Sequence, residues 1–262
     1  GGRGSLRGGG GGPPPPAALA AGRALLRKKE PGASREEVDS LTWFQLRDRL
    51  LAAAPLDAKH VRAVNAAELK YWESTPGMRV GWSDELLGFD CGGQQWVLEV
   101  AFPTGTLAKP SYADLDFVQG VLADIKKLGV AAPCPIEQRW TSTSKSKMSP
   151  ASAEDADTVH SWVGIIMYLP TDDPKQRADI TAAFKEYGAR VMARQGRAAG
   201  ATEHWAKIEL PATEEGRAEM RARVAKRFPV EEFNRARAAL DPKNVLANDL
   251  IDGVFGVPAA AA

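Results

Sequence analysis

The order of strand-like and helix-like segments after residue 94 most constrains the fold of this chain. Apolar and polar residues alternate from Gln94 to Phe102, which is typical of a half-buried strand. An amphipathic helix is predicted over 111–128, and two further strands are predicted over 136–140 and 161–169. A second helix, a fourth strand and two more helices follow. This order predicts an α+β fold, with an antiparallel sheet and helices packed on one face.

Helix start and stop signals define the remaining elements. Asp173 followed by Pro174 begins a helix, whose inward-facing residues are expected to be Ile180, Phe184, Tyr187 and Val191. In the helix over 111–128 the apolar stripe consists of Leu115, Val118, Leu122, Ile125 and Leu128. A fourth strand is predicted over 203–210, and helices are predicted over 40–54, 57–73, 213–227 and 230–240.

The first 36 residues differ from the rest of the chain. They contain a glycine run, a proline run and a basic patch at Arg27-Lys28-Lys29. Such a segment buries too little apolar surface to offset its ordering entropy, so we expect disorder over 1–36. Its basic, acid-poor character also suggests a transit peptide, but the chain does not begin with Met and a truncated gene model is preferred. Beyond it we expect a helical connector over 37–93, a main domain over 94–256 and a tail over 257–262.

Composition argues against several functional classes. The formal net charge is +1, so no global field attracts nucleic acid or anionic lipid, and no nucleic-acid partner is expected. No segment approaches the roughly 20 apolar residues that span a bilayer. The cysteines Cys91 and Cys134 and the scattered histidines show no metal-ligand spacing, which predicts neither a disulfide scaffold nor a metal site.

A charged pair lies on the second predicted strand, Ile136-Glu137-Gln138-Arg139-Trp140. Successive side chains of a strand point to opposite faces, so Glu137 and Arg139 project together while Ile136 and Trp140 share the other face. A carboxylate and a guanidinium held in this way can orient an alcohol or lactone and stabilise a developing anion. The alternative is a surface ion pair, which would contribute little.

Several blocks, many of them containing tryptophan, occur in a characteristic order: Arg79–Glu85, Leu87–Trp96, Pro133–Thr141, Ser161–Pro170, His204–Glu209 and Leu240–Asn248. In this order they resemble the C-terminal half of the aldonolactone oxidoreductases, flavoproteins of the vanillyl-alcohol-oxidase type that include plant and algal L-galactono-1,4-lactone dehydrogenases. The resemblance extends from about Thr42 to Phe255. It implies that residues 94–256 form the substrate-binding cap domain of such an enzyme and that its N-terminal FAD-binding domain is absent from this chain.

The resemblance also implies roles for the charged pair. Glu137 and Arg139 would lie over the flavin and hold the lactone. Arg139, always charged and donating in a fixed fork, would stabilise the anionic reduced flavin. Glu137 would bind a substrate hydroxyl or accept its proton, and the sequence does not decide between the two.

A lysine on the predicted fourth strand is a further candidate. Lys207 would share a strand face with Trp205 and Glu209 and contact substrate oxygens, or it would pair with Glu209 at the surface. His204 would point to the opposite face and pack in the core.

The two cysteines and one asparagine complete the candidate residues. The resemblance implies that Cys91 is a redox-sensitive thiol near the substrate entrance, whereas a lone cysteine is more often inert. Cys134, between two prolines, is expected to be structural. Asn248 would help line the interface with the flavin domain, or it would be a polar turn residue.

Two functions from different classes follow from the resemblance. In the first, the chain is the substrate-binding part of an enzyme that oxidises L-galactono-1,4-lactone to ascorbate, transfers hydride to FAD and then electrons to cytochrome c. That enzyme would be mitochondrial, at the inner membrane facing the intermembrane space. In the second, the chain is a non-catalytic interaction module with a role in assembly of respiratory complex I.

Overall fold

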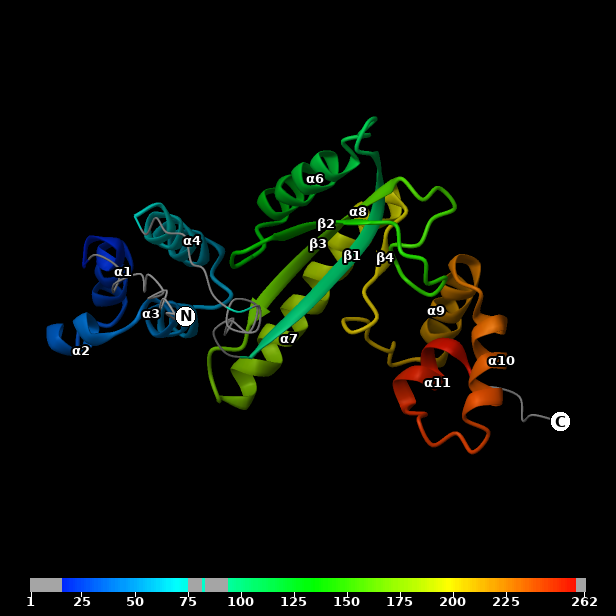
Figure 1. Cartoon of the computed structure of the whole chain (residues 1–262). Coiled ribbons are helices and arrows are strands. Elements are labelled where there is room, and N and C mark those ends of the chain that lie inside the picture. The colour runs from blue at the N-terminus through cyan, green and yellow to red at the C-terminus, as the bar shows by residue number, and fades with distance from the viewer. Residues whose placement is uncertain (1–15, 75–81, 83–93, 258–262) are drawn as a thin grey trace, which may run out of the picture. The chain divides into compact units, whose positions relative to one another are not determined.

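The structure, a computed structural model, describes residues 16–74, 82 and 94–257 (Figure 1). It divides into two compact units, each formed by three stretches of the chain. Unit 1 consists of Gly1–Val97, Gly120–Ile136 and Ile165–Arg194, and unit 2 consists of Leu98–Gln119, Glu137–Gly164 and Gln195–Ala262.

Four strands form one sheet: β1 (Gln95–Thr106), β2 (Glu137–Ser142), β3 (Thr158–Tyr168) and β4 (Thr202–Glu203). Their order across the sheet is β2-β3-β1-β4, and neighbouring strands are antiparallel. Because the first two and last two strands are each connected through a helix, the chain follows a β-α-β-β-α-β order. The predicted α+β class is therefore confirmed.

Two helices, α6 (Ala113–Leu128) and α7 (Pro174–Tyr187), contact the same face of β1. Phe102 of β1 stacks on Phe117 of α6, with ring centroids 4.7 Å apart, and Trp96 of β1 stacks on Phe184 of α7 at 6.2 Å. Trp96 and Phe102 are six residues apart, so strand alternation places them on one face. By strand alternation, Val97 of β1 and Ile166 and Tyr168 of β3 lie on the opposite face, and they pack in the core of the N-terminal helices. Helices therefore cover parts of both faces, in contrast to the prediction of helices on one face.

The apolar stripe predicted for α6 is not the face that this helix buries. Phe117 and Val121 are buried, whereas Leu115 and Leu122 are 47% and 52% exposed. The buried face also carries Asp114, whose carboxylate accepts hydrogen bonds from β2. A buried acid with hydrogen-bond partners is tolerated, so the orientation of α6 depends on the polar partners of Asp114 and cannot be read from the spacing of the leucines alone.

The chain before the sheet is helical from its first described residues. The elements are η1 (Pro16–Leu19), α1 (Ala20–Lys29), α2 (Arg35–Ser40), α3 (Trp43–Ala53) and α4 (Ala58–Glu73). Side-chain caps begin three of these helices: Ser34 caps α2, Thr42 forms a capping box with Gln45 at α3, and Asp57 caps α4. The helices predicted over 40–54 and 57–73 correspond to α3 and α4.

The expectation of disorder over residues 1–36 is wrong for residues 16–36, while residues 1–15 lie outside the described part. Leu26 of α1 is 0% exposed and belongs to the core of unit 1, together with Leu46 and Leu50 of α3. Gly22 allows the close approach, because a Cβ there would lie 2.8 Å from Leu46 Cδ2. Composition alone missed this packing because α3 supplies the apolar partner surface.

The rest of the chain adds helices after α7. A π-helical turn (Gly188–Met192) and α8 (Ala193–Ala199) follow α7, and α9 (Glu214–Arg227), α10 (Val230–Leu240) and α11 (Asp249–Phe255) follow β4. The predicted inward residues of α7 and this turn, Ile180, Phe184, Tyr187 and Val191, are all buried. The short α11 was not predicted from the sequence. In unit 2 its Phe255 packs against Trp205, with ring centroids 5.2 Å apart.

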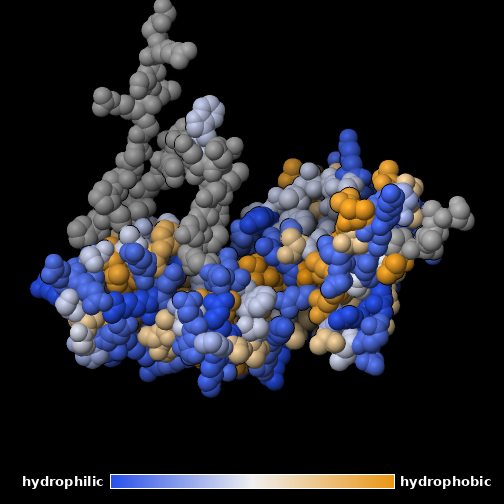
Figure 2. Space-filling model, turned by 90° about the horizontal axis from the view of Figure 1, so that it is seen from below, coloured by the Kyte–Doolittle hydropathy of each residue, from blue (hydrophilic) through white to orange (hydrophobic). Residues whose placement is uncertain are grey.

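In the view of Figure 2, hydrophilic residues cover most of the described surface and hydrophobic residues form small separate groups. None of the helices within residues 16–74 and 94–257 has the length and hydrophobicity needed to cross a membrane.

Candidate functional site

In unit 2 the predicted charged pair lies on the face of the sheet opposite α6. On β2, Gln138 and Trp140 donate hydrogen bonds to Asp114 of α6, at 3.2 and 3.0 Å, so they point toward the helix layer. Strand alternation then places Glu137 and Arg139 on the opposite face. The opposition of the charged pair to Gln138 and Trp140, predicted from the sequence, is therefore observed in the structure.

Arg139 is held between two carboxylates. Its Nε and Nη2 donate to Glu137 Oε1 at 2.8 and 2.5 Å, and its Nη1 lies 3.8 Å from Oε1 of Glu99 on β1. The side chains of Arg139 and Glu137 are 55% and 42% exposed, whereas that of Glu99 is only 6% exposed. A buried acid thus lies beside the guanidinium, and the Arg139 side chain as a whole is about half exposed. Such an arrangement preorganises donors for a substrate oxygen.

Glu99 was not among the residues predicted for the site. The signal was present in the sequence, because a charged residue occurs between Val97 and Ala101 in the middle of a strand. Carboxylates are almost never fully buried unless paired, so such a position indicates a nearby cation. Only the order of strands in the sheet shows that the cation is Arg139.

An aromatic residue of β3 lies next to the charged pair. Trp162 is directly opposite Arg139 in the β2–β3 ladder, and cross-strand partners share a face. Its Nε1 donates to Thr141 at 2.9 Å, and its ring contacts the edge of His204, with centroids 5.5 Å apart. The face of the sheet opposite α6 therefore combines a guanidinium, carboxylates and a tryptophan, which can bind a polar ring compound through hydrogen bonds and stacking.

The structure corrects the predicted fourth strand. β4 contains only Thr202 and Glu203, which pair with Ala101 and Val100 of β1. The chain then turns, and the backbone N–H of Lys207 donates to the carbonyl oxygen of His204 at 2.8 Å. Lys207 therefore lies in a turn, and the strand-face argument that grouped it with Trp205 and Glu209 is wrong.

His204 is also placed differently from the expectation. It is half-buried rather than in the core, and its Nδ1 accepts a hydrogen bond from the backbone N–H of Ala206 at 3.0 Å. Since the His204 ring contacts Trp162, His204 lies beside the face of the sheet opposite α6.

Asn248 and Cys91 are the two remaining candidate residues. Asn248 is the N-cap of α11, and its Oδ1 accepts a hydrogen bond from the backbone N–H of Ile251 at 2.9 Å. Its side chain thus has a local structural role. Cys91 lies outside the described residues.

Cys134 lies in a polar cluster of unit 1, whereas the charged pair belongs to unit 2. Its Sγ donates to Glu68 Oε2 at 2.9 Å, and Asn65 Oδ1 accepts from its backbone N–H at 3.1 Å. Burial, reinforced by the Glu68 carboxylate, raises the pKa of the Cys134 thiol far above its ordinary range. A thiol that stays protonated is a poor nucleophile, so the structure agrees with the expected structural role.

A pH dependence of stability follows for unit 1. Burial also raises the pKa of the Tyr168 and Tyr187 hydroxyls. In the unfolded chain, cysteine ionises above about pH 8.5 and tyrosine above about pH 10, whereas in the folded chain these groups stay protonated. The unfolded state therefore binds fewer protons at high pH, and the free energy of unfolding should fall as pH rises above about 8.5.

Urea denaturation at about pH 7.5 and about pH 10 would measure this fall as a lower midpoint at the higher pH. The variant Tyr187→Phe removes one of the responsible hydroxyls, so its midpoint should fall less. A midpoint that is constant or rises between the two pH values would contradict the prediction.

Among the residues that the structure describes, no cluster of three or more histidine, cysteine, aspartate or glutamate side chains is arranged to hold a metal ion. On the face of the sheet opposite α6, Arg139 can donate hydrogen bonds to an oxygen, and Glu137 and Glu99 can accept a hydrogen bond or proton from a hydroxyl.

Comparisons with known proteins show the family of this chain. The family model described as D-arabinono-1,4-lactone oxidase matches residues 37–254. The mitochondrial L-galactono-1,4-lactone dehydrogenase 1 of Oryza sativa subsp. japonica is 53% identical over 221 residues, which cover 84% of this chain and 38% of the relative. The mitochondrial L-galactono-1,4-lactone dehydrogenase of Arabidopsis thaliana is 50% identical over 234 residues, which cover 89% of this chain and 38% of that relative. This chain thus spans less than two fifths of the length of these relatives. It belongs to the D-arabinono-1,4-lactone oxidase family.

Proposed function

We propose that this chain is the substrate-binding part of an FAD-dependent aldonolactone oxidoreductase that oxidises L-galactono-1,4-lactone to ascorbate. Membership of the family and the names of the relatives support the reaction class and the substrate. The observation that carries the proposal is the Glu137–Arg139–Glu99 arrangement on the face of the sheet opposite α6. It offers an accessible cation and an acid to a ligand that carries both a carbonyl and hydroxyl groups.

Each charged residue has a distinct part in this proposal. Arg139 donates hydrogen bonds to an oxygen of the lactone or of the flavin ring, through the outer side of its half-exposed guanidinium. Glu137 accepts a hydrogen bond from a substrate hydroxyl or takes its proton. Glu99, buried beneath the guanidinium, keeps it oriented and does not itself contact the substrate.

The open face fits a flavin because a fixed guanidinium beside a tryptophan can bind the carbonyl edge of a planar ring. When bound, FAD would accept the hydride from the lactone. The relatives' additional length, beyond the 38% that this chain covers, would supply most of the contacts to FAD. The remaining residue roles are proposals of the same kind: Lys207 would contact substrate oxygens, Cys91 would be a redox-sensitive thiol, and Asn248 would lie near the flavin interface.

The acceptor and location are also part of the proposal. Electrons would pass from the flavin to cytochrome c, and the protein would be mitochondrial, at the inner membrane facing the intermembrane space. The names of the relatives support the mitochondrial location.

A chimera tests the proposed function directly. Residues 37–254 of this chain would replace the matching segment of the rice relative, and lactone-dependent reduction of cytochrome c would be measured. We expect a flavin spectrum and turnover from the chimera, and little or no turnover from this chain alone with added FAD. A chimera that folds and binds flavin but does not oxidise the lactone would overturn the assignment of substrate to this cap.

A second candidate function is that of a non-catalytic interaction module in respiratory complex I assembly. The observation that favours it is a group of exposed apolar side chains near the C-terminus of unit 2: Leu240, Val245 and Leu246 are 86%, 74% and 82% exposed. Exposed apolar residues of this kind are suited to a protein contact. A visible spectrum bears on the choice, because retained flavin absorbance in the purified chain favours the enzyme, whereas a colourless folded protein favours the module or an enzyme fragment.

A further inference from the structure

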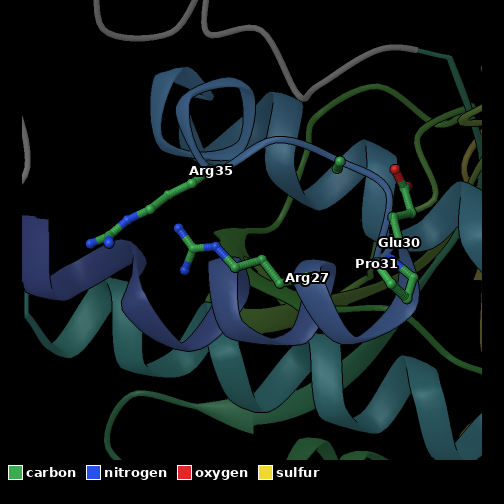
Figure 3. A pocket seen from close by; sticks show the side chains of 5 residues that line it. Arg27, Glu30, Pro31 and Arg35 are labelled. Carbon is green, nitrogen blue, oxygen red and sulfur yellow. The ribbon is translucent and has the colours of Figure 1, made fainter.

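The basic segment of the N-terminal helices forms a cavity that the proposed function does not use. The cavity has a volume of about 340 Å³ and is lined by Arg27, Glu30, Pro31, Ala33 and Arg35 (Figure 3). Arg27 comes from α1, Arg35 comes from the start of α2, and the other three residues lie in the connection between the helices. The lining lies before residue 37, where the match to the family model begins.

Positive charge exceeds negative charge beside this cavity. Three guanidinium groups surround the single carboxylate of Asp39: Arg27 Nη2 at 2.5 Å from Oδ1, Arg35 Nε at 3.5 Å from Oδ2 and Arg23 Nε at 3.7 Å from Oδ1. Three positive charges against one negative charge leave two positive charges uncompensated in this group.

The acidic residue that lines the cavity does not cancel this excess. Glu30 is engaged by Arg49, whose Nε donates to Glu30 Oε2 at 2.8 Å and whose Nη2 contacts the same oxygen. Arg49 also pairs with Glu37. Arg49 neutralises only one of the two carboxylates Glu30 and Glu37, so the whole group of four arginines and three carboxylates keeps a net charge of +1.

Two donors in the cluster lack acceptors. The Nε atoms of Arg23 and Arg27 are buried and have no hydrogen-bond partner among the residues that the structure describes. A buried donor without a partner is unfavourable, and an oxyanion beside it would supply the missing acceptor. Arg35 is 87% exposed at its side chain, so its guanidinium can reorient toward a ligand at little cost in contacts.

We propose that Arg23, Arg27 and Arg35 form a binding site for a phosphate group. A phosphate group carries about two negative charges near neutral pH and several strong acceptor oxygens. The negative charge suits a group with surplus positive charge, and the acceptor oxygens suit guanidinium forks, which bind phosphate bidentately. The cavity is larger than a single phosphate, so a phosphorylated compound or diphosphate fills it better. The source is either a soluble phosphate compound or the headgroup of an anionic phospholipid.

Titration calorimetry on the whole chain would test the site with pyrophosphate as the soluble probe, at ionic strength matched with chloride. Flotation with phosphatidylcholine vesicles, with and without phosphatidic acid, would test the lipid source. We expect saturable binding in one of these arms. Arg27→Gln should weaken the binding about fivefold or more, because it removes one of the guanidinium groups that would bind the ligand. Arg23 and Arg35 would still pair with Asp39 in this variant.

Arg35→Gln serves as a second variant that preserves the fold, since this side chain is almost fully exposed, and it should also weaken binding. Arg190→Gln is the matched control, because Arg190 is a surface arginine paired with Glu186 on another helical segment, and it should bind like the parent. Binding by pyrophosphate identifies a soluble source, and binding only to phosphatidic acid vesicles identifies a lipid source. Absence of binding in both arms, or equal binding by Arg27→Gln, Arg35→Gln and the parent, would overturn the proposal.

Discussion

Replacing Arg139 by lysine in the chimera with the rice relative is expected to lower kcat/KM for the lactone at least about tenfold, which corresponds to roughly 1.4 kcal/mol of transition-state stabilisation. Lysine keeps the positive charge but loses the planar fork, which in the structure donates to Glu137 through Nε and Nη2 while Nη1 faces Glu99. Steady-state kinetics of cytochrome c reduction would measure the change.

Glu137→Gln should have an effect of the same order, because it keeps the shape but removes the charge and the basic oxygen. The double variant should lose less than the sum of the two single variants, since the two side chains are in contact and act on one substrate. Glu99→Gln should also lower kcat/KM, through a less firmly oriented guanidinium.

Gln138→Ala is the matched control on the same strand. Gln138 donates to Asp114 and Ser161 on the helix side of the sheet, so its loss should lower stability modestly and leave kcat/KM nearly unchanged. If Gln138→Ala lowers kcat/KM as much as Arg139→Lys, or if Arg139→Lys leaves kcat/KM unchanged, the face of the sheet opposite α6 is not the substrate site.

Leu26→Ala is expected to destabilise unit 1 by about 2–5 kcal/mol, because Leu26 is fully buried in the core formed by α1, α3 and α4. The loss combines the transfer free energy of the removed methyl groups with the cavity that they leave. Urea denaturation followed by circular dichroism would measure it as a lower midpoint.

Leu240→Ala provides the comparison, since the same chemical change is made at a side chain that is 86% exposed, and its midpoint should shift little. Equal midpoints for Leu26→Ala and the parent would show that α1 does not pack on the core in solution. That result would restore the expectation of disorder for the N-terminal segment.

The sequence determined the features that depend on local periodicity. Alternation along residues 137–140 was sufficient to separate Glu137 and Arg139 from Gln138 and Trp140, because side-chain direction in a strand follows from backbone geometry alone. The helix start at Asp173 was likewise predicted, since a cap satisfies backbone donors within a few residues.

Tertiary structure decided which surfaces meet. The leucines of α6 form a regular stripe, yet the helix buries Phe117 and Val121, since Asp114 finds donors on β2. The fourth strand ends at Glu203 because the chain then turns, with the Lys207 N–H donating to the His204 carbonyl oxygen. These outcomes depend on partners far away in the sequence, and a local pattern carries no information on such partners.

The same reasoning applies to the candidate site and to the N-terminal helices. Two members of the charged group, Glu137 and Arg139, are neighbours in the sequence and were predicted, whereas Glu99 joins them only through the order of strands in the sheet. Leu26 has a core to enter only because α3 presents Leu46 and Leu50 to it. Burial is a property of a pair of surfaces, so the sequence of one segment determines its helix or strand, and only the fold determines what that element covers.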